Sequence, residues 1–224
     1  MFIGHFAPAF IAAAVSPRSP KLGTLFVAAQ LVDWAFFTLA LVGVERMRID
    51  PAASVMVPFD LYDMPFTHSL AGTLVFAAVF ATIVTVWQRN ALGGLLAGLV
   101  VLSHWLLDWL VHVPDLTLGG EPPKYGLGLW NYPWLAIPLE LAVIGGAFAF
   151  YFRRTRGPAG PPFVLLAVML GLQAFNWFAP HPAEAGPFLF VQALLAFGVL
   201  TALAVWVSTN RGIKVRRGLA WSPS

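Results

Sequence analysis

Residues 91–113 read ALGGLLAGLVVLSHWLLDWLVHV, an apolar stretch that contains three ionisable side chains. The stretch is long enough for a helix to cross a hydrocarbon core of about 30 Å. The ionisable residues are spaced four apart, so on an α-helix they lie on one face. An ionisable group in a membrane span costs about 2.5–3.5 kcal/mol on insertion scales, and it usually pairs, binds an ion or faces the bundle interior. The stretch therefore predicts a membrane helix with a site at His104, Asp108 and His112.

The composition of the 224-residue chain is that of a membrane protein. Hydrophobic residues make up 59% and charged residues 10%, against about 45–50% and 25% in soluble domains. The chain has no cysteine, which excludes disulfides and thiolate metal ligands. The net charge is +3, but the basic residues lie beside apolar runs, so no nucleic-acid partner is expected. We expect one integral-membrane helical domain over 1–224, with a partial helix at 1–15 and a basic cytoplasmic tail at 209–224.

Six apolar stretches are long enough to cross a membrane. They predict an all-α, polytopic membrane helix bundle with about six transmembrane helices, at 22–44, 69–88, 91–113, 133–152, 162–179 and 187–208. The stretch from Phe2 to Val15 would be only about 20 Å long as a helix, so we expect a re-entrant or partial helix. A signal peptide cleaved between Ala12 and Ser16 is the alternative, although no basic residue precedes the apolar run.

Basic residues alternate along the connecting segments, which predicts the orientation. Because positive charge is enriched on the cytoplasmic side, the more basic set of loops and the C-terminus are expected to be cytoplasmic. That set is Arg18, Lys21, Arg89, Arg153, Arg154, Arg156, Arg211, Lys214, Arg216 and Arg217, whereas Arg46, Arg48 and Lys124 fall on the other side.

Counting along the predicted helices places seven ionisable residues from five segments in the outer half of the bilayer. Imidazoles and carboxylates without cysteine suit Zn²⁺, Mn²⁺, Fe²⁺ or Ni²⁺, and a metal-bound water would supply a nucleophile for hydrolysis. The seven residues are His5, Asp33, His68, His104, Asp108, His112 and Glu140.

Each of these residues also has a simpler interpretation. His104 alone could be an interhelical hydrogen-bonding group, Asp33 could pair with a buried histidine, and His112 could be hydrated at the interface. Other polar residues fit plain structural roles: Asp60, Asp115 and His181 in loops, Thr67 or Ser69 as a helix cap, Ser103 as a packing hydroxyl, and Trp87, Trp130, Trp134 and Trp221 as interfacial anchors.

Several of these residues occur in motifs that resemble a bacterial family of inner-membrane metal-dependent hydrolases, the YdjM-like group. The matching pieces run in order from the N-terminus to about residue 140: Gly4-His5, Asp33, Phe66-Thr67-His68-Ser69, and Ser103-His104 with Asp108. The resemblance implies a multi-pass protein of the bacterial inner membrane whose metal ligands are His5, Asp33, His68, His104 and Asp108. Two positions depart from the pattern: Ala35 replaces a second aspartate, and Asp63 stands where a histidine is expected.

The sequence thus predicts an integral-membrane, metal-dependent hydrolase for a lipid-like or small amphiphilic substrate. Zinc is the expected ion, with manganese, iron and nickel as alternatives. Glu140 or Asp63 could act as general base, and Arg46, Arg48 and Lys124 could meet a phosphate or lipid headgroups. A transporter or ion-conducting protein is the second hypothesis, but few polar residues continue through the cytoplasmic half. A non-catalytic membrane scaffold is the third. The oligomeric state is left open.

Overall fold

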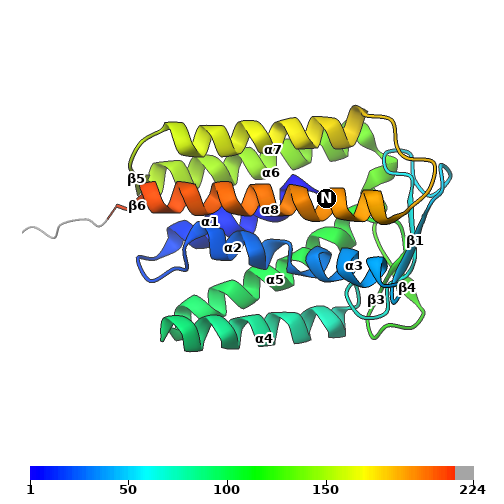
Figure 1. The fold of residues 1–224 in the computed structure, drawn as a ribbon, viewed down its shortest axis with the longest axis horizontal. Helices are drawn as coiled ribbons and strands as arrows, with labels where there is room; N and C mark the ends of the chain where they lie inside the picture. The colour runs from blue at the N-terminus through cyan, green and yellow to red at the C-terminus, as the bar shows by residue number, and fades with distance from the viewer. Residues whose placement is uncertain (215–224) are drawn as a thin grey trace, which may run out of the picture.

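The structure is a computed structural model that describes residues 1–214, and its helices run side by side along one long axis (Figure 1). Five helices are long and apolar enough to cross a membrane: α4 (Leu70–Gln88), α5 (Ala91–Val111), α6 (Pro133–Arg154), α7 (Gly160–Phe178) and α8 (Pro187–Asn210). A bent pair of helices makes six spans if it crosses the membrane as one. The prediction of an all-α membrane bundle is therefore confirmed. Residues 215–224 of the expected tail, with Arg216, Arg217 and Trp221, lie outside the described residues.

The bent pair consists of α2 (Leu22–Ala29) and α3 (Leu31–Leu41), which meet at an angle of 52°. The sequence predicted one span over 22–44, and the structure adds a bend near Gln30. At the break, the N–H of Gln30 donates to the carbonyl of Ala28 instead of continuing the α-helical pattern. The carbonyl of Ala29 accepts a hydrogen bond of 2.8 Å from the imidazole of His104. Breaks of this kind occur where another group satisfies the freed backbone atoms.

The N-terminal segment is a short helix inside the bundle, as predicted. It begins with the 3-10 turn η1 (Ile3–Phe6) and continues as α1 (Ala7–Val15). The segment packs against α6 and α2, and the rings of Phe6 and Phe10 lie 4.4 and 5.3 Å from the ring of Phe26. Figure 1 shows the N-terminus within the outline of the bundle. This packing holds the start of the chain, including His5, in the interior.

The two ends of the bundle carry different connections. At one end, hereafter the loop end, lie the hairpins β1 (Arg46–Ile49) with β2 (Phe59–Asp63) and β3 (Leu116–Thr117) with β4 (Lys124–Tyr125), together with the turn η2 (Leu129–Asn131). The opposite end, hereafter the basic end, carries β5 (Thr155–Arg156) paired with β6 (Gly212–Ile213). The predicted alternation of connections between two ends is thus present.

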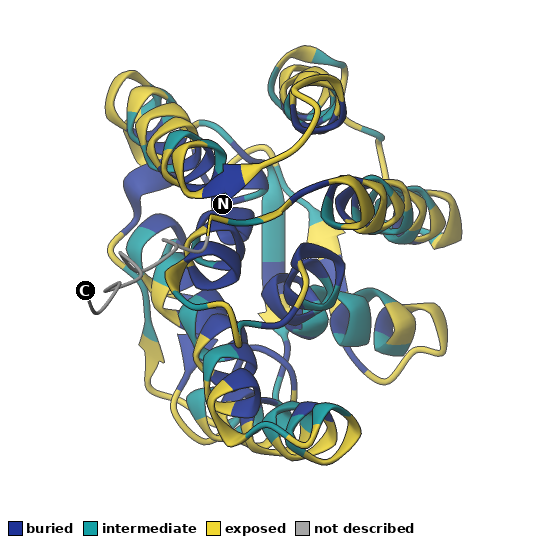
Figure 2. Ribbon diagram, turned by 90° about the vertical axis from the view of Figure 1, so that its left-hand side faces the viewer, coloured by how far each residue is buried: buried dark blue, intermediate teal, exposed yellow. Residues whose placement is uncertain are grey.

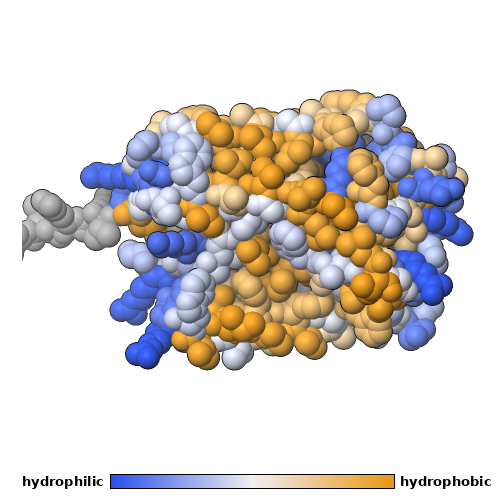
Figure 3. All heavy atoms as spheres, in the orientation of Figure 1, coloured by the Kyte–Doolittle hydropathy of each residue, from blue (hydrophilic) through white to orange (hydrophobic). Residues whose placement is uncertain are grey.

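The surface between the two ends is apolar. Figure 3 shows hydrophilic residues at both ends and a broad hydrophobic region between them. Seen along the bundle axis (Figure 2), exposed residues lie on the outward faces of the helices. Many of these are large and apolar, such as Val75, Leu95, Phe163 and Leu195, with 62, 58, 51 and 64% exposure. Such a surface fits a multi-pass membrane protein, in which lipid covers the outward faces.

Small residues bring α4 and α5 close together, which fixes the helix that carries the central site residues. A Cβ atom added at Gly94 would overlap the Thr85 hydroxyl, and one at Gly98 would lie 3.1 Å from the carbonyl oxygen of Ala77. Helices in membranes use small residues in this way to let their backbones approach. The α4 helix begins at its N-cap, Ser69, whose hydroxyl accepts the N–H of Gly72 at 3.0 Å.

Candidate metal centre

Four of the five histidines of the chain meet two aspartates in the interior, toward the loop end. The helix α5 supplies His104 and Asp108, and His112 ends it. The other three come from separate segments: His5 from η1, Asp33 from α3, and His68 from the residue before the α4 N-cap. All are buried except Asp33, whose side chain is 21% exposed. The convergence that the sequence predicted is therefore present.

The three α5 residues face one another as their spacing predicted. The Nε2 atom of His104 lies 3.0 Å from Oδ2 of Asp108, one turn further along. The Nε2 atom of His112 lies 3.3 Å from the other carboxylate oxygen, Oδ1. Asp108 therefore stands between two imidazoles of its own helix.

Two more histidines approach the same carboxylate from other elements. The Nε2 atom of His5 lies 2.9 Å from Oδ1 of Asp108, and that of His68 lies 3.7 Å from Oδ2. The main-chain nitrogen of Met1 lies 3.4 Å from Oδ1. Asp33 Oδ1 completes the group, 3.4 Å from His68 Nε2 and 3.5 Å from His104 Nε2. All four histidines thus present Nε2 to a carboxylate.

The opposite ring nitrogen, Nδ1, is held by the protein in three of the four histidines. His104 Nδ1 donates to the carbonyl of Ala29 at 2.8 Å. His112 Nδ1 lies 3.0 and 3.2 Å from the two carboxylate oxygens of Asp115. Because a carbonyl and a carboxylate only accept, these bonds assign the proton to Nδ1. The Nε2 atom of a neutral ring then carries the lone pair.

His68 is held through a relay of two side chains. The Thr67 hydroxyl donates to Oε2 of Glu45 at 2.6 Å, so its oxygen accepts from His68 Nδ1 at 2.9 Å. Glu45 itself is fixed by the backbone N–H groups of Phe66 and Thr67, both at 2.9 Å. The backbone carbonyl of His68 accepts from the Trp105 indole at 3.1 Å. His68 is thus held through its side chain by Thr67 and through its backbone by Trp105.

These bonds leave nitrogen lone pairs facing carboxylate oxygens in a buried setting. Two acceptors at 3.0–3.7 Å repel each other unless a proton or a metal ion lies between them. A histidine whose other nitrogen is bonded to a carbonyl or carboxylate is the usual arrangement of a metal ligand. The cluster could therefore hold a metal ion.

The spacing of the donor atoms fits a small coordination sphere. Ligands at about 2.0–2.2 Å from a tetrahedral ion lie about 3.3–3.6 Å apart. The imidazoles of His68 and His104 lie 3.0–3.7 Å from the carboxylate oxygens of Asp33 and Asp108. Among the described residues, two sets of donor atoms lie within 4.8 Å of one another: His5, His104 and Asp108, and Asp33, His68 and His104.

The two residues considered as general base lie in different places. Glu140, on α6, is buried, accepts the N–H of Gly4 at 2.9 Å through Oε1, and lines the same cavity as Asp108. Asp63 ends β2 opposite Arg46 and is not among the residues that line this cavity. The structure thus brings Glu140 near the cluster and leaves Asp63 outside it.

Several residues with plain structural interpretations contribute to the site. Asp115 does lie in a loop, but it is buried and holds His112. Trp130 was expected at the interface; instead it is buried, with its ring 4.1 Å from the His112 ring. Ser69 is the α4 cap, whereas Thr67 binds Glu45. The three-residue spacing of His112 and Asp115 is a usable signal; we find none for Glu45, which the sequence analysis missed.

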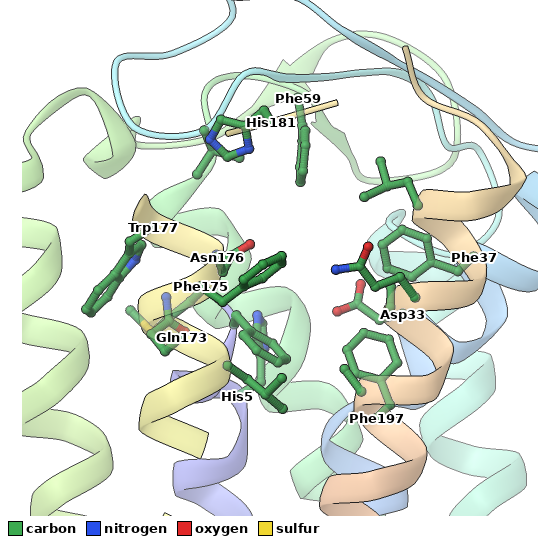
Figure 4. A pocket seen from close by; sticks show the side chains of 18 of the residues that line it. His5, Asp33, Phe37, Phe59, Gln173, Phe175, Asn176, Trp177, His181 and Phe197 are labelled. Carbon is green, nitrogen blue, oxygen red and sulfur yellow. The ribbon is translucent and has the colours of Figure 1, made fainter. Parts of the chain in front are cut away.

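A cavity of about 680 Å³ adjoins the cluster, with walls that include α3, α7 and α8. Figure 4 shows Asp33 and His5 facing this space, with His181 and Phe59 at its loop side. His104 is not among the lining residues, and its ring stacks at 3.8 Å on that of His5, which is. The lining also includes Phe175, Phe188 and Leu195, which are 57, 81 and 64% exposed. The cavity therefore reaches the outer, lipid-facing surface at α7 and α8.

Comparison of the chain with protein-family models, with curated proteins and with solved structures finds no match. What the protein can do is therefore inferred from the chemistry of this site: it is a membrane-helix protein with a buried His/Asp cluster that could hold a metal ion.

Proposed function

We propose that the protein is a membrane-embedded, metal-dependent hydrolase that acts on a lipid-like or other amphiphilic substrate. The observation that carries the proposal is the direction of the imidazoles: their Nε2 atoms face two carboxylates while protein acceptors hold Nδ1 of three rings. The donors are nitrogen and oxygen only, which favours zinc and also suits manganese, iron or nickel.

The placement of the cluster beside a cavity favours catalysis over a purely structural role. Structural zinc sites are closed by four protein ligands, whereas catalytic sites keep an open position. Here His5, Asp33, His68, Asp108 and His112 all line the cavity. A divalent ion held there would lower the pKa of a bound water toward about 7 and so supply a nucleophile at neutral pH.

Glu140 is the residue we assign as general base. Its Oε1 atom is occupied by the Gly4 N–H, and this bond fixes the side chain. The carboxylate lines the cavity, where it could accept a proton from water. Glu140 would therefore orient and deprotonate water without belonging to the metal ligands.

The form of the cavity supports an amphiphilic substrate. Its volume of about 680 Å³ lies within the usual range of ligand sites, about 300–1,000 Å³. One wall carries the polar cluster, and the lipid-facing walls are aromatic and aliphatic, with Phe175, Phe188 and Leu195 among them. A molecule with an apolar chain could enter from the bilayer and present its polar bond to the cluster.

The same proposal extends to family and location. The motifs around His5, Asp33, His68 and His104 support membership of the YdjM-like group and a bacterial inner-membrane location. The alternation of basic loops supports a cytoplasmic basic end, which would put the cluster in the outer half of the bilayer.

A transporter is the second candidate, because the break at Gln30 resembles the interrupted helices that form transporter ion sites. A conducting path would need ionisable groups between the cluster and the basic end. Within residues 1–214, the buried histidine and charged side chains lie in the cluster or toward the loop end, apart from Arg211 at the basic end. This distribution favours a closed pocket over a pathway.

The test compares metal content and turnover in two nearly isosteric variants of the detergent-purified protein. Turnover is measured on a substrate found by screening lipid phosphoesters, esters and amides. Asp108→Asn should lose metal and stability together, because Asp108 contacts all four imidazoles. Glu140→Gln should keep metal and fold while turnover falls by about 10²–10⁴-fold.

Asp60→Asn is the matched control, since Asp60 pairs with Arg48 in the β1–β2 hairpin at the loop end, and it should change neither quantity. A folded wild-type protein that contains no metal and takes up none on titration would contradict the proposal. Unchanged turnover in Glu140→Gln would remove Glu140 from the mechanism.

A further inference from the structure

We propose that the centre holds two divalent ions bridged by Asp108, a statement that rests on the proposed metal-dependent function. Each oxygen of this carboxylate has its own pair of imidazoles. Oδ1 lies 2.9 Å from His5 Nε2 and 3.3 Å from His112 Nε2. Oδ2 lies 3.0 Å from His104 Nε2 and 3.7 Å from His68 Nε2. A carboxylate so placed binds one ion through each oxygen, and ions in two-metal sites lie about 3.5–4 Å apart.

His104 belongs to both sets of donor atoms, yet it can serve only one ion. Its Nδ1 is committed to the carbonyl of Ala29, so only Nε2 remains for a metal. One ion would then take His68, His104 and Asp33 Oδ1, whose donor atoms lie within 4.8 Å of one another, with Asp108 Oδ2 beside His104 at 3.0 Å. His5 and Asp108 Oδ1 are left over and need a third donor.

His112 is that third donor. It is 4% exposed, so hydration at the interface does not account for its position. Asp115 holds its Nδ1 at 3.0 Å, and the ring of Trp130 packs 4.1 Å away. Both contacts aim Nε2 at the carboxylate of Asp108. Asp115 is thus a positioning residue for a metal ligand, a role that carboxylates commonly have behind ligating histidines.

The two ions would differ in their access to the cavity. Donors of both ions line the cavity, but the first ion has a further donor, His104, outside the cavity wall, whereas His5, His112 and Asp108 of the second ion all line it. The second ion therefore has three protein donors and an open position toward the cavity, the pattern of catalytic sites. Glu140, held through Gly4 next to His5, lines the same space. The second ion is thus the one beside which water would be activated.

The test counts Mn²⁺ ions bound per chain after chelator treatment and equilibrium dialysis against Mn²⁺, with electron paramagnetic resonance on the same samples. Wild type should bind two ions that show a spin-coupled signal. His112→Gln and Asp115→Asn should each bind one ion, and the coupled signal should disappear. The control is His181→Gln, which removes the histidine outside the cluster and should still bind two.

Each result bears on a separate part of the proposal. One ion in wild type at saturation overturns the two-ion centre and leaves the proposed hydrolase function standing, whereas no ion overturns both. Two ions in both His112→Gln and Asp115→Asn would refute the assignment of His112. Size-exclusion profiles show whether each variant is folded. If His112→Gln does not fold, the number of ions bound by Asp115→Asn, compared with wild type, still decides whether His112 is a metal ligand.

Discussion

Replacing Thr67 by valine tests whether the relay from Glu45 prepares His68 for metal binding. The variant removes the hydroxyl with little change of shape. It deletes a hydrogen bond of 2.6 Å to a carboxylate and one of 2.9 Å to an imidazole, both buried. Such bonds contribute about 1.5–3 and 0.5–1.5 kcal/mol respectively. The expected loss of stability is therefore about 2–4.5 kcal/mol, although Glu45 Oε1 keeps its two backbone N–H partners at 2.9 Å.

The effect on metal binding should be separate and measurable. Residues that orient a ligand typically change metal affinity by 10–100-fold, equivalent to about 1.4–2.7 kcal/mol. We therefore expect Thr67→Val to weaken Zn²⁺ binding by about that factor, measured by competition with a chelator of known affinity. Thr82→Val is the control, because the Thr82 hydroxyl bonds only to its own helix, at the carbonyl of Ala78. A folded Thr67→Val protein with an affinity within twofold of wild type would show that the relay does not orient His68.

Two further predictions concern orientation and helix packing. Reporter fusions at Pro158 and Ser224 should both give cytoplasmic signals, because the basic residues gather on that side; a periplasmic signal at either position overturns the orientation but not the cluster. Gly98→Leu should lower the midpoint of thermal unfolding in detergent and weaken metal binding, because α5 could no longer approach Ala77, whereas Gly145→Leu, at a helical position with open space, should have little effect on either.

The parts of the site that follow from local periodicity could be predicted from the sequence. His104, Asp108 and His112 lie one helical turn apart, so their common face follows from the geometry of the helix alone. The helix that carries them is equally predictable, because its length and polarity suit a bilayer. The depth at which Asp33 and Glu140 meet this face also follows from counting residues along their spans.

The residues that orient the histidines could not be predicted in the same way, because their positions depend on tertiary contacts. Glu45 reaches Thr67 across 22 residues of sequence, through a hairpin whose path no periodicity describes. Trp130 stands at the start of a span, where an anchor is the usual role, but the chain turns back so that Gly128 N–H donates to the carbonyl of His112 at 2.6 Å. The break at Gln30 likewise depends on another helix, because the imidazole of His104 donates a hydrogen bond to the carbonyl of Ala29.

Protons on the histidines are the physical alternative to a metal, and the two alternatives need different geometry at His104. A proton on Nε2 must point along the ring axis toward an acceptor to form a hydrogen bond. This atom is buried and lies 3.0 Å from Asp108 Oδ2 and 3.5 Å from Asp33 Oδ1, yet it forms a hydrogen bond to neither. A proton on Nε2 would therefore be held by the charges of the two carboxylates without an aligned hydrogen bond. A metal ion needs only the lone pair of Nε2, with carboxylate oxygens beside it, and this is the arrangement that the Ala29 carbonyl creates by holding Nδ1.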